Sequence, residues 1–370
     1  MHKVLILLMF YGVAVSTLAG CDSKGTDQLR NSRAALGEKL FHSPALSNPP
    51  GQACASCHDE NTAFSSPASI LPTAVGAAGV RGRRQVPTLT YAHFAPPLAF
   101  NGTEQIFFGG LFWDGRADSL EAQVAGPLLS PLEMNNSSKA EVVSKLAASD
   151  LATEFRATLG EDIFDDVDRA FDALAGSIAE YQRTEEFAPF TSKYDYYLSG
   201  AVELTAQELR GLALFNSPNK GNCAACHPST GSSGAPPLFT DFTFDNLGVP
   251  KNPSNPFYKQ GLDINPEGAN FIDLGLAATT ERAEDRGKQK VMTLRNIAKT
   301  APYFHNGVFN DLETVVRFYN SRDLGSFSPP EVPENVNHDE LGNLGLSSAE
   351  ISDLVAFLHT LSDGFGPTNQ

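Results

Sequence analysis

The sequence has few basic residues. Its 27 Lys and Arg stand against 43 Asp and Glu, so the 370 residues carry a formal net charge of −16 at pH 7. Nucleic-acid binders present basic surface, and this composition therefore argues against a nucleic-acid partner. It permits a basic protein partner, because complementary charge speeds encounter, and it equally suits an acidic surface that only keeps the chain soluble. The length leaves room for two domains of ordinary size.

Cysteine is also scarce. Four of the five Cys fall in two runs of one pattern, residues 54–58 (CASCH) and 223–227 (CAACH), and the fifth is Cys21. No pair of thiols is left for a disulfide. The C-x-x-C-H pattern is typical of covalent c-type haem attachment, in which the thiols bond to the vinyl groups and the His binds the iron. Two haem c groups are therefore expected, with thioethers at Cys54, Cys57, Cys223 and Cys226 and proximal ligands at His58 and His227.

The N-terminus holds a short hydrophobic run. Lys3 precedes the apolar residues 4–10, and small residues follow up to Leu-Ala-Gly-Cys at 18–21. This pattern indicates a secretory signal peptide over residues 1–20 and is too short for a membrane span. The last four residues resemble a bacterial lipobox, so we expect a lipid anchor at Cys21, with an ordinary cleaved signal as the alternative. A polar tether over 21–31 would then hold the protein at a membrane facing the periplasm.

The rest of the chain predicts a mainly α fold with long irregular loops. Apolar residues recur three or four positions apart in several segments, and Pro, Gly and Asn fill the stretches between them. A linker is expected over 191–200, which separates an N-terminal domain (32–190) from a C-terminal domain (191–370). The expected helices cover residues 36–41, 119–124, 139–159, 163–184, 205–215, 312–319 and 348–361.

The order of the motifs resembles that of the bacterial di-haem cytochrome c peroxidase/MauG family over about residues 36–361. The resemblance implies two cytochrome c-like domains with one haem c each, and an enzyme that acts on hydrogen peroxide. The motifs that carry it are the two haem runs, Phe-Trp-Asp-Gly-Arg-Ala at 112–117, Glu-Met at 133–134, Leu-Arg-Asn at 294–296 and Pro-Tyr-Phe-His at 302–305.

The resemblance also assigns residues to the reaction. In the family, a Gln and a Glu ten residues apart lie over the open face of the N-terminal haem, and here they are Gln123 and Glu133. Glu133 would be the general acid and base, and Gln123 would position peroxide or water. Trp113, the only Trp in the chain, would relay electrons between the haems.

One family residue is missing. Many of these peroxidases carry a His, ten residues before the Pro of a Pro-Thr pair, that blocks the N-terminal iron until the other haem is reduced. Counting back from Pro87 gives Ala77, which cannot bind iron. We therefore expect a first haem that is five-coordinate or water-bound in the resting ferric state. The alternative is that His93, beyond the Pro-Thr pair, moves in as the ligand.

The distal ligand of the second haem separates the subgroups of the family. It lies fourteen residues after the His of Pro-Tyr-Phe-His, which from His305 gives Tyr319. The electron-accepting peroxidases usually have Met there, whereas MauG has Tyr. A phenolic oxygen is a harder donor that favours ferric iron, so Tyr319 favours the MauG-like subgroup. The alternatives are a core Tyr with the position filled otherwise, and Met292 as a thioether ligand.

The family further binds calcium between the haems through an Asn and two backbone carbonyls. The carbonyl positions match Thr300 and Pro302, and the Asn position is Gln85 in this chain. Glutamine can supply an oxygen ligand on a longer side chain.

Three functions remain open at this stage. The first is peroxide reduction with electrons from a small cytochrome c or cupredoxin. The second is MauG-like, peroxide-dependent oxidation of side chains on a partner protein. The third is a di-haem electron carrier without catalysis, which would have two six-coordinate haems that ignore peroxide. A homodimer is compatible with each of them.

Overall fold

The computed structural model describes residues 23–67, 72–231 and 235–366. Within these ranges the chain is mainly helical, which confirms the expected fold class, and two antiparallel strand pairs are its only sheets. The helices are α1 (Ser23–Phe41), α2 (Leu120–Leu129), α3 (Lys139–Ala147), α4 (Ala152–Leu159), α5 (Val167–Tyr181), α6 (Lys193–Leu198), α7 (Ala206–Phe215), α8 (Ala277–Thr280), α9 (Leu312–Ser321) and α10 (Ser348–His359). The strands are β1 (Ala99–Asn101), β2 (Ile106–Phe108), β3 (Phe244–Asp245) and β4 (Gln289–Lys290).

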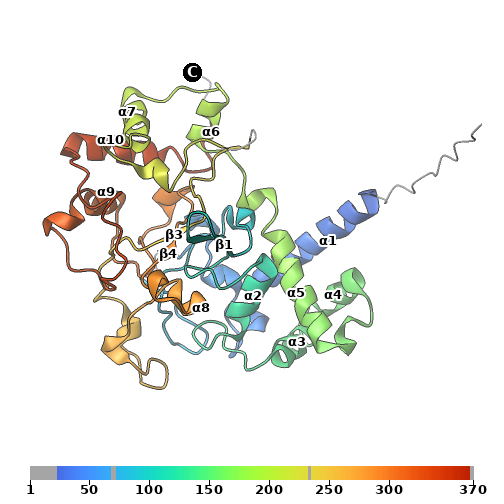
Figure 1. The fold of residues 1–370 in the computed structure, drawn as a ribbon. Helices are drawn as coiled ribbons and strands as arrows, with labels where there is room; N and C mark the ends of the chain where they lie inside the picture. The colour runs from blue at the N-terminus through green and yellow to red at the C-terminus, as the bar shows by residue number, and fades with distance from the viewer. Residues whose placement is uncertain (1–22, 68–71, 232–234, 367–370) are drawn as a thin grey trace, which may run out of the picture.

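The first hydrophobic core forms where α1, α2 and α3 pack on α5. Figure 1 shows α1 crossing α5. The two helices approach closely because Gly37 faces the backbone of Ser177, where a Cβ atom would overlap the Ser177 carbonyl. Phe171 and Leu174 of α5 are fully buried in this core, as their helical spacing predicts.

The second core lies where α10 packs against α7 and α9. The α7 helix begins with a capping box, in which the Thr205 side chain accepts from the Glu208 amide and the Glu208 carboxylate accepts from the Thr205 amide. Phe215 and Phe357 are fully buried at its centre. Each core therefore supports one of the two haem-binding runs, which are short turns outside the helices.

Four sequence expectations about local structure need correction. The α1 helix begins at Ser23, so it includes most of the expected tether, and Arg30 holds this part to Glu180 of α5 by an ion pair of 2.9 Å. The α2 helix continues to Leu129 through Pro127, because the apolar Leu128 is buried in the first core. The expected helix 139–159 is interrupted at residues 148–151, which divides it into α3 and α4. The expected linker contains the helix α6.

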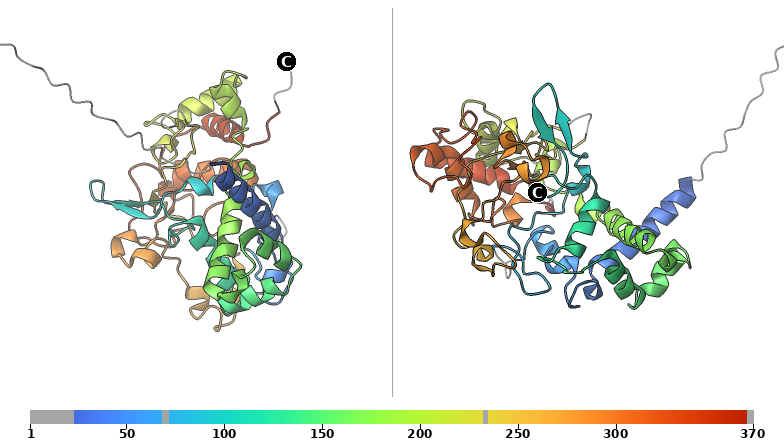
Figure 2. Two further views of the ribbon diagram at one scale, coloured as in Figure 1. Left: turned by 90° about the vertical axis from the view of Figure 1, so that its right-hand side faces the viewer. Right: turned by 60° about the horizontal axis from the view of Figure 1, so that its bottom comes forward.

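The strand pairs are too short to be recognised in the sequence. The β1–β2 hairpin pairs Ala99 with Phe108 and stands out from the body of the molecule in both views of Figure 2. At its base, an isolated bridge joins Phe108 to Thr243, next to β3. The hairpin therefore connects the N-terminal half of the chain to the C-terminal half near Trp113.

Candidate active site

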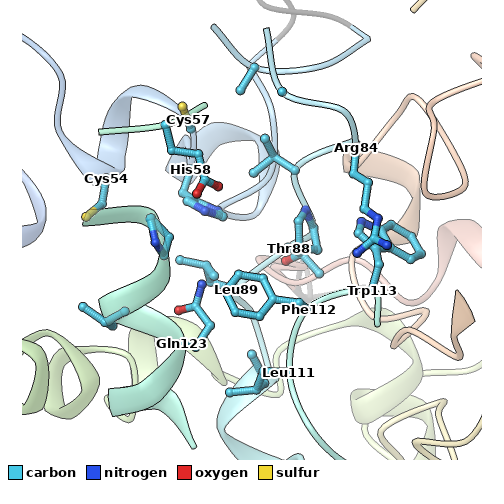
Figure 3. Close-up of a pocket in the computed structure, with 18 of the residues that line it drawn as sticks. Cys54, Cys57, His58, Arg84, Thr88, Leu89, Leu111, Phe112, Trp113 and Gln123 are labelled. Atoms are coloured by element: carbon cyan, nitrogen blue, oxygen red, sulfur yellow. The ribbon is translucent and has the colours of Figure 1, made fainter. Parts of the chain in front are cut away.

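The first haem-binding run forms one wall of a cavity of about 390 Å³. Cys54, Cys57 and His58 lie on one side, and Gln123 reaches into the same space from α2 on the other (Figure 3). Residues 54–56 form a single 3₁₀ turn, and the amide of His58 donates to the Cys54 carbonyl at 2.9 Å. This tight turn directs two thiols and an imidazole into one cavity. Glu133, from the loop that follows α2, completes the lining.

The second run lines another cavity, of about 200 Å³. Cys223, Cys226 and His227 again share a wall, and Tyr319 projects into the cavity from α9. No described residue hydrogen-bonds to the Tyr319 hydroxyl, and burial, followed by the nearby Cys223 and Cys226, raises the pKa of this phenol. The structure thus places an unpaired phenol in the same cavity as the second C-x-x-C-H turn.

Both histidines are oriented in the same way. Nδ1 of His58 donates to the Phe64 carbonyl at 2.8 Å, and Nδ1 of His227 donates to the Phe239 carbonyl, also at 2.8 Å. This bond fixes the tautomer and leaves Nε2 as the nitrogen that can bind a metal. Burial lowers the pKa of His58 to about 4 and also lowers that of His227, which keeps both rings neutral. The two sites therefore fit a covalent haem c each.

Glu133 is held over the first cavity by its backbone. Its amide donates to the Ser130 carbonyl at 3.1 Å, and its carbonyl accepts from the Ala77 amide at 2.7 Å. Burial raises the pKa of the Glu133 carboxyl, although Ser130, Arg116 and Arg83 act in the opposite direction. A half-buried carboxyl of raised pKa that lines a cavity is suited to general acid and base work.

No histidine side chain enters the first cavity opposite His58 within the described part of the chain. Ala77 lies on a tight turn whose Gly76 contacts the Leu132 backbone so closely that a Cβ atom at position 76 would overlap its carbonyl. His93 stacks on Phe94 with ring centres 4.0 Å apart and does not line the cavity. Burial, followed by the nearby Arg183 cation, lowers the pKa of His93.

Trp113 lies between the two sites and lines both cavities. Its indole Nε1 donates to the Gln85 carbonyl at 2.9 Å, and its own carbonyl accepts from the Lys290 amide at 2.9 Å. Met292, the candidate thioether, also borders both cavities. Trp113 is thus held through its indole by the N-terminal half of the chain and through its backbone by the C-terminal half.

The sequence analysis missed an ion network that fixes the segment around Trp113. Arg84 donates to Asp114 at 2.7 Å and, through two nitrogens, to Asp273 at 2.6 Å. All three side chains are buried, and the guanidinium holds the pKa of both carboxyls below their usual range. Figure 3 shows Arg84 beside Trp113 at one end of the cavity. Asp273 is 189 residues from Arg84, so no local pattern could have revealed the pair.

The structure brings two of the three expected calcium ligands together. The Gln85 side-chain amide donates to the Thr300 carbonyl at 3.4 Å and to the Ser65 hydroxyl at 3.0 Å. No contact joins Pro302 to Gln85 in the described regions. The chain as described also contains no group of three or more His, Cys, Asp or Glu that could hold a metal ion.

Cys21 lies outside the described residues, so the expected lipid anchor is not placed by the structure. Of the helices formed by the described residues, none is both long enough and apolar enough to cross a membrane.

Residues 31–203 match the family described as di-haem cytochrome c peroxidase. The methylamine utilization protein MauG of Paracoccus denitrificans is 39% identical over 351 residues, which are 89% of this chain and 88% of that protein. The cytochrome c peroxidase Ccp of Escherichia coli is 31% identical over 345 residues, which are 91% of this chain and 60% of that protein. The solved diheme peroxidase BthA from Burkholderia thailandensis matches with a TM-score of 0.78 and 35% identity, over 90% of this chain and 86% of that one.

Proposed function

This chain belongs to the di-haem cytochrome c peroxidase/MauG family, and we propose that it reduces hydrogen peroxide at the first cavity with electrons relayed through the second. The family implies two haem c groups, and the two cavities fit them. When bound, the haems supply redox chemistry: together with an external donor, they deliver the two electrons that turn hydrogen peroxide and two protons into two waters. The observation that carries the assignment is the inequality of the cavities, one bordered by Gln123 and Glu133 and the other by Tyr319.

Glu133 and Gln123 act on peroxide in the first cavity. The Glu133 carboxylate takes a proton from one peroxide oxygen and gives it to the other as the O–O bond breaks. The Gln123 amide has a donor and an acceptor, so it can orient peroxide or the leaving water. Because Ala77 stands where a blocking His would enter, peroxide has access to this site without prior reduction.

The second site stores charge and exchanges electrons. Tyr319 is its proposed distal ligand, opposite His227, and Trp113 is the proposed relay between the sites. The hydrogen bonds that hold the indole and the backbone of Trp113 support this role, because a relay that does not move needs little reorganisation when its charge changes.

A second candidate function is the peroxide-dependent oxidation of side chains on a partner protein. Two observations favour it: Tyr319 in place of a thioether at the second cavity, and the 39% identity to a protein named MauG. In the first function the partner is a small cytochrome c or cupredoxin that donates electrons. In the second it is the protein substrate.

Several finer features belong to this proposal. Residues 32–190 and 191–370 are the proposed haem domains. Signal peptide cleavage before Cys21 and lipidation of this residue would place the enzyme at a periplasmic membrane face. Calcium would be held by Gln85, Thr300 and Pro302, and a homodimer is compatible with the surface charge.

The test uses purified protein loaded with both haems. Peroxide consumption is measured with a reduced cytochrome c as donor, beside Glu133→Gln and the exposed control Glu104→Gln. The proposal expects steady consumption that falls at least a hundredfold in Glu133→Gln and is unchanged in the control. Equal rates in all three proteins would contradict the assignment of Glu133, and no consumption in the parent would contradict the peroxidase function.

A further inference from the structure

A chain of polar and aromatic side chains leads away from Trp113, on the C-terminal side of the molecule. The Trp113 and His305 rings meet edge to face, with centres 6.4 Å apart. Nε2 of His305 lies 3.7 Å from Oε2 of Glu331, and Oε1 of Glu331 accepts from the Tyr258 hydroxyl at 3.4 Å. These contacts connect the relay between the haem sites to a tyrosine near the surface.

Two atoms in the middle of this chain lack partners. Nε2 of His305 and Oε2 of Glu331 are both buried, and neither has a hydrogen-bond partner among the described residues. Both residues line the second cavity, and buried polar atoms without partners often mark a functional site. Oε1 of Glu331 accepts from the Tyr258 hydroxyl and from the Asp273 amide at 3.3 Å, and the residue lines the second cavity.

Trp113 and Tyr258 differ in the group that could accept the ring's N–H or O–H proton when the side chain is oxidised. The Trp113 indole donates to the backbone carbonyl of Gln85, which is not a base, so an oxidised Trp113 keeps its proton. The Tyr258 phenol donates to a carboxylate, which can accept the proton when the ring loses an electron. Oxidation of Tyr258 can therefore yield a neutral radical.

The cation above Tyr258 makes this proton transfer necessary. The Lys251 ammonium lies 4.3 Å from the centre of the Tyr258 ring. A cation over an aromatic face opposes the removal of an electron from that ring. Loss of the phenolic proton to Glu331 offsets this effect, so electron and proton must leave together.

We propose that Tyr258 is a redox-active residue that gives one electron to oxidised Trp113 and its phenolic proton to Glu331 during peroxide turnover. The inference rests on the proposed peroxidase function, with hydrogen peroxide as the oxidant. Each peroxide takes two electrons and two protons to form two waters. Tyr258 supplies one electron and becomes a neutral tyrosyl radical, and Trp113 returns to its reduced form. The other electron comes from the external reductant or, where none is present, would come from the haem pair.

Tyr258 would give the enzyme an oxidation site outside the haem cavities. The ring is half-buried and packs on Phe257 and Phe271, so its edge can be reached from solvent. When the donor protein is scarce, the radical would form there and could be quenched by a small reductant. The indole of Trp113 would be spared.

The experiment uses the haem-loaded full chain, mixed with peroxide without a donor and frozen within milliseconds for electron paramagnetic resonance. We expect a tyrosyl signal that narrows when tyrosine is ring-deuterated. It should vanish in Tyr258→Phe and fall at least tenfold in Glu331→Gln. Tyr181→Phe is the matched control, because the Tyr181 hydroxyl also donates to a carboxylate, Glu186, at 3.0 Å without a link to Trp113.

Peroxide consumption in the same samples separates the two proposals. Consumption by the parent protein with a tyrosyl signal that persists in Tyr258→Phe, or with no tyrosyl signal at all, would overturn the role of Tyr258 and leave the peroxidase function intact. Absence of any reaction with peroxide would overturn both. Loss of the signal in Tyr181→Phe alone would assign the radical to the N-terminal core instead.

Discussion

The backbone amide of Ala77 donates a hydrogen bond to the backbone carbonyl of Glu133 at 2.7 Å. The segment that would carry a blocking histidine is therefore attached to the residue proposed as the general acid and base. No histidine other than His58 lines the first cavity among the described residues, and the segment around Ala77 holds the backbone of Glu133 at its edge.

The first prediction concerns Gly76, next to that contact. In Gly76→Ala the new Cβ would overlap the Leu132 carbonyl, so the turn must move away from the backbone of Glu133. We expect peroxide turnover to fall about tenfold or more, since small displacements of catalytic groups cost about that much. Gly82→Ala is the control in the same segment, because its Cβ would have no neighbour closer than 3.7 Å. Equal turnover in both variants would show that the turn does not position Glu133.

The second prediction concerns pH. Burial raises the pKa of Glu133, so the carboxyl stays protonated to a higher pH than an ordinary Glu, whose pKa is about 4.3. A general base works only when deprotonated, and kcat/KM for peroxide should therefore rise with pH through a midpoint above this value. The rise should be absent in Glu133→Gln. An unchanged profile in that variant would assign the titration to another group.

The third prediction concerns stability. Arg84→Met leaves the buried Asp273 without its cation, which should cost about 3–5 kcal/mol, measured as a lower unfolding midpoint in denaturant. Arg317→Met is the control, since Arg317 pairs with the exposed Glu313 one helical turn away and should matter by about 0.5 kcal/mol or less.

The ion network of Arg84, Asp114 and Asp273 also predicts how the free energy of unfolding changes in acid. Arg84 lowers the pKa of Asp273 and Asp114 in the folded state, so their stabilisation is present above the unfolded value of about 3.9 and is lost as pH falls through the folded pKa. The deficit of Arg84→Met should therefore be largest near neutral pH and shrink in acid. A deficit that is the same at pH 3 and pH 7 would contradict this electrostatic origin.

The fourth prediction concerns Tyr319. In Tyr319→Met a thioether replaces the phenol at the second cavity, and the potential of that haem should rise, with a changed absorption spectrum. Tyr303→Phe is the control, because the Tyr303 hydroxyl donates to the Ile297 backbone carbonyl and is not a proposed ligand. A spectrum and potential that do not change in Tyr319→Met would remove Tyr319 from the ligand set.

The residues that bind haem covalently could be predicted from the sequence, because their spacing is local. Haem attachment requires two thiols and an imidazole in a fixed spacing, so residues 54–58 and 223–227 could be recognised without a structure. Helices whose apolar residues recur regularly were also predictable. For α10, the expected range 348–361 differs from Ser348–His359 by two residues.

Long-range contacts could not be predicted. The path of α2 through Pro127 depends on burial of Leu128 in the first core. The N-terminal part of α1 contacts α5 through Arg30 and Glu180, which are 150 residues apart. Arg84 and Glu331 carry no local signal, because each acquires its role only from partners that the fold brings together. The sequence therefore identifies the haem sites and not the network between them.

The central claim is that two similar haem-binding runs form unequal sites, one open to peroxide and one capped. The most direct test is the electronic spectrum of the resting ferric protein, recorded before and after peroxide is added, for the parent and for Glu133→Gln. The account predicts a high-spin component from the first site that changes rapidly on addition of peroxide, and a slower change in Glu133→Gln. Two low-spin haems that do not respond to peroxide would contradict it and would identify an electron carrier.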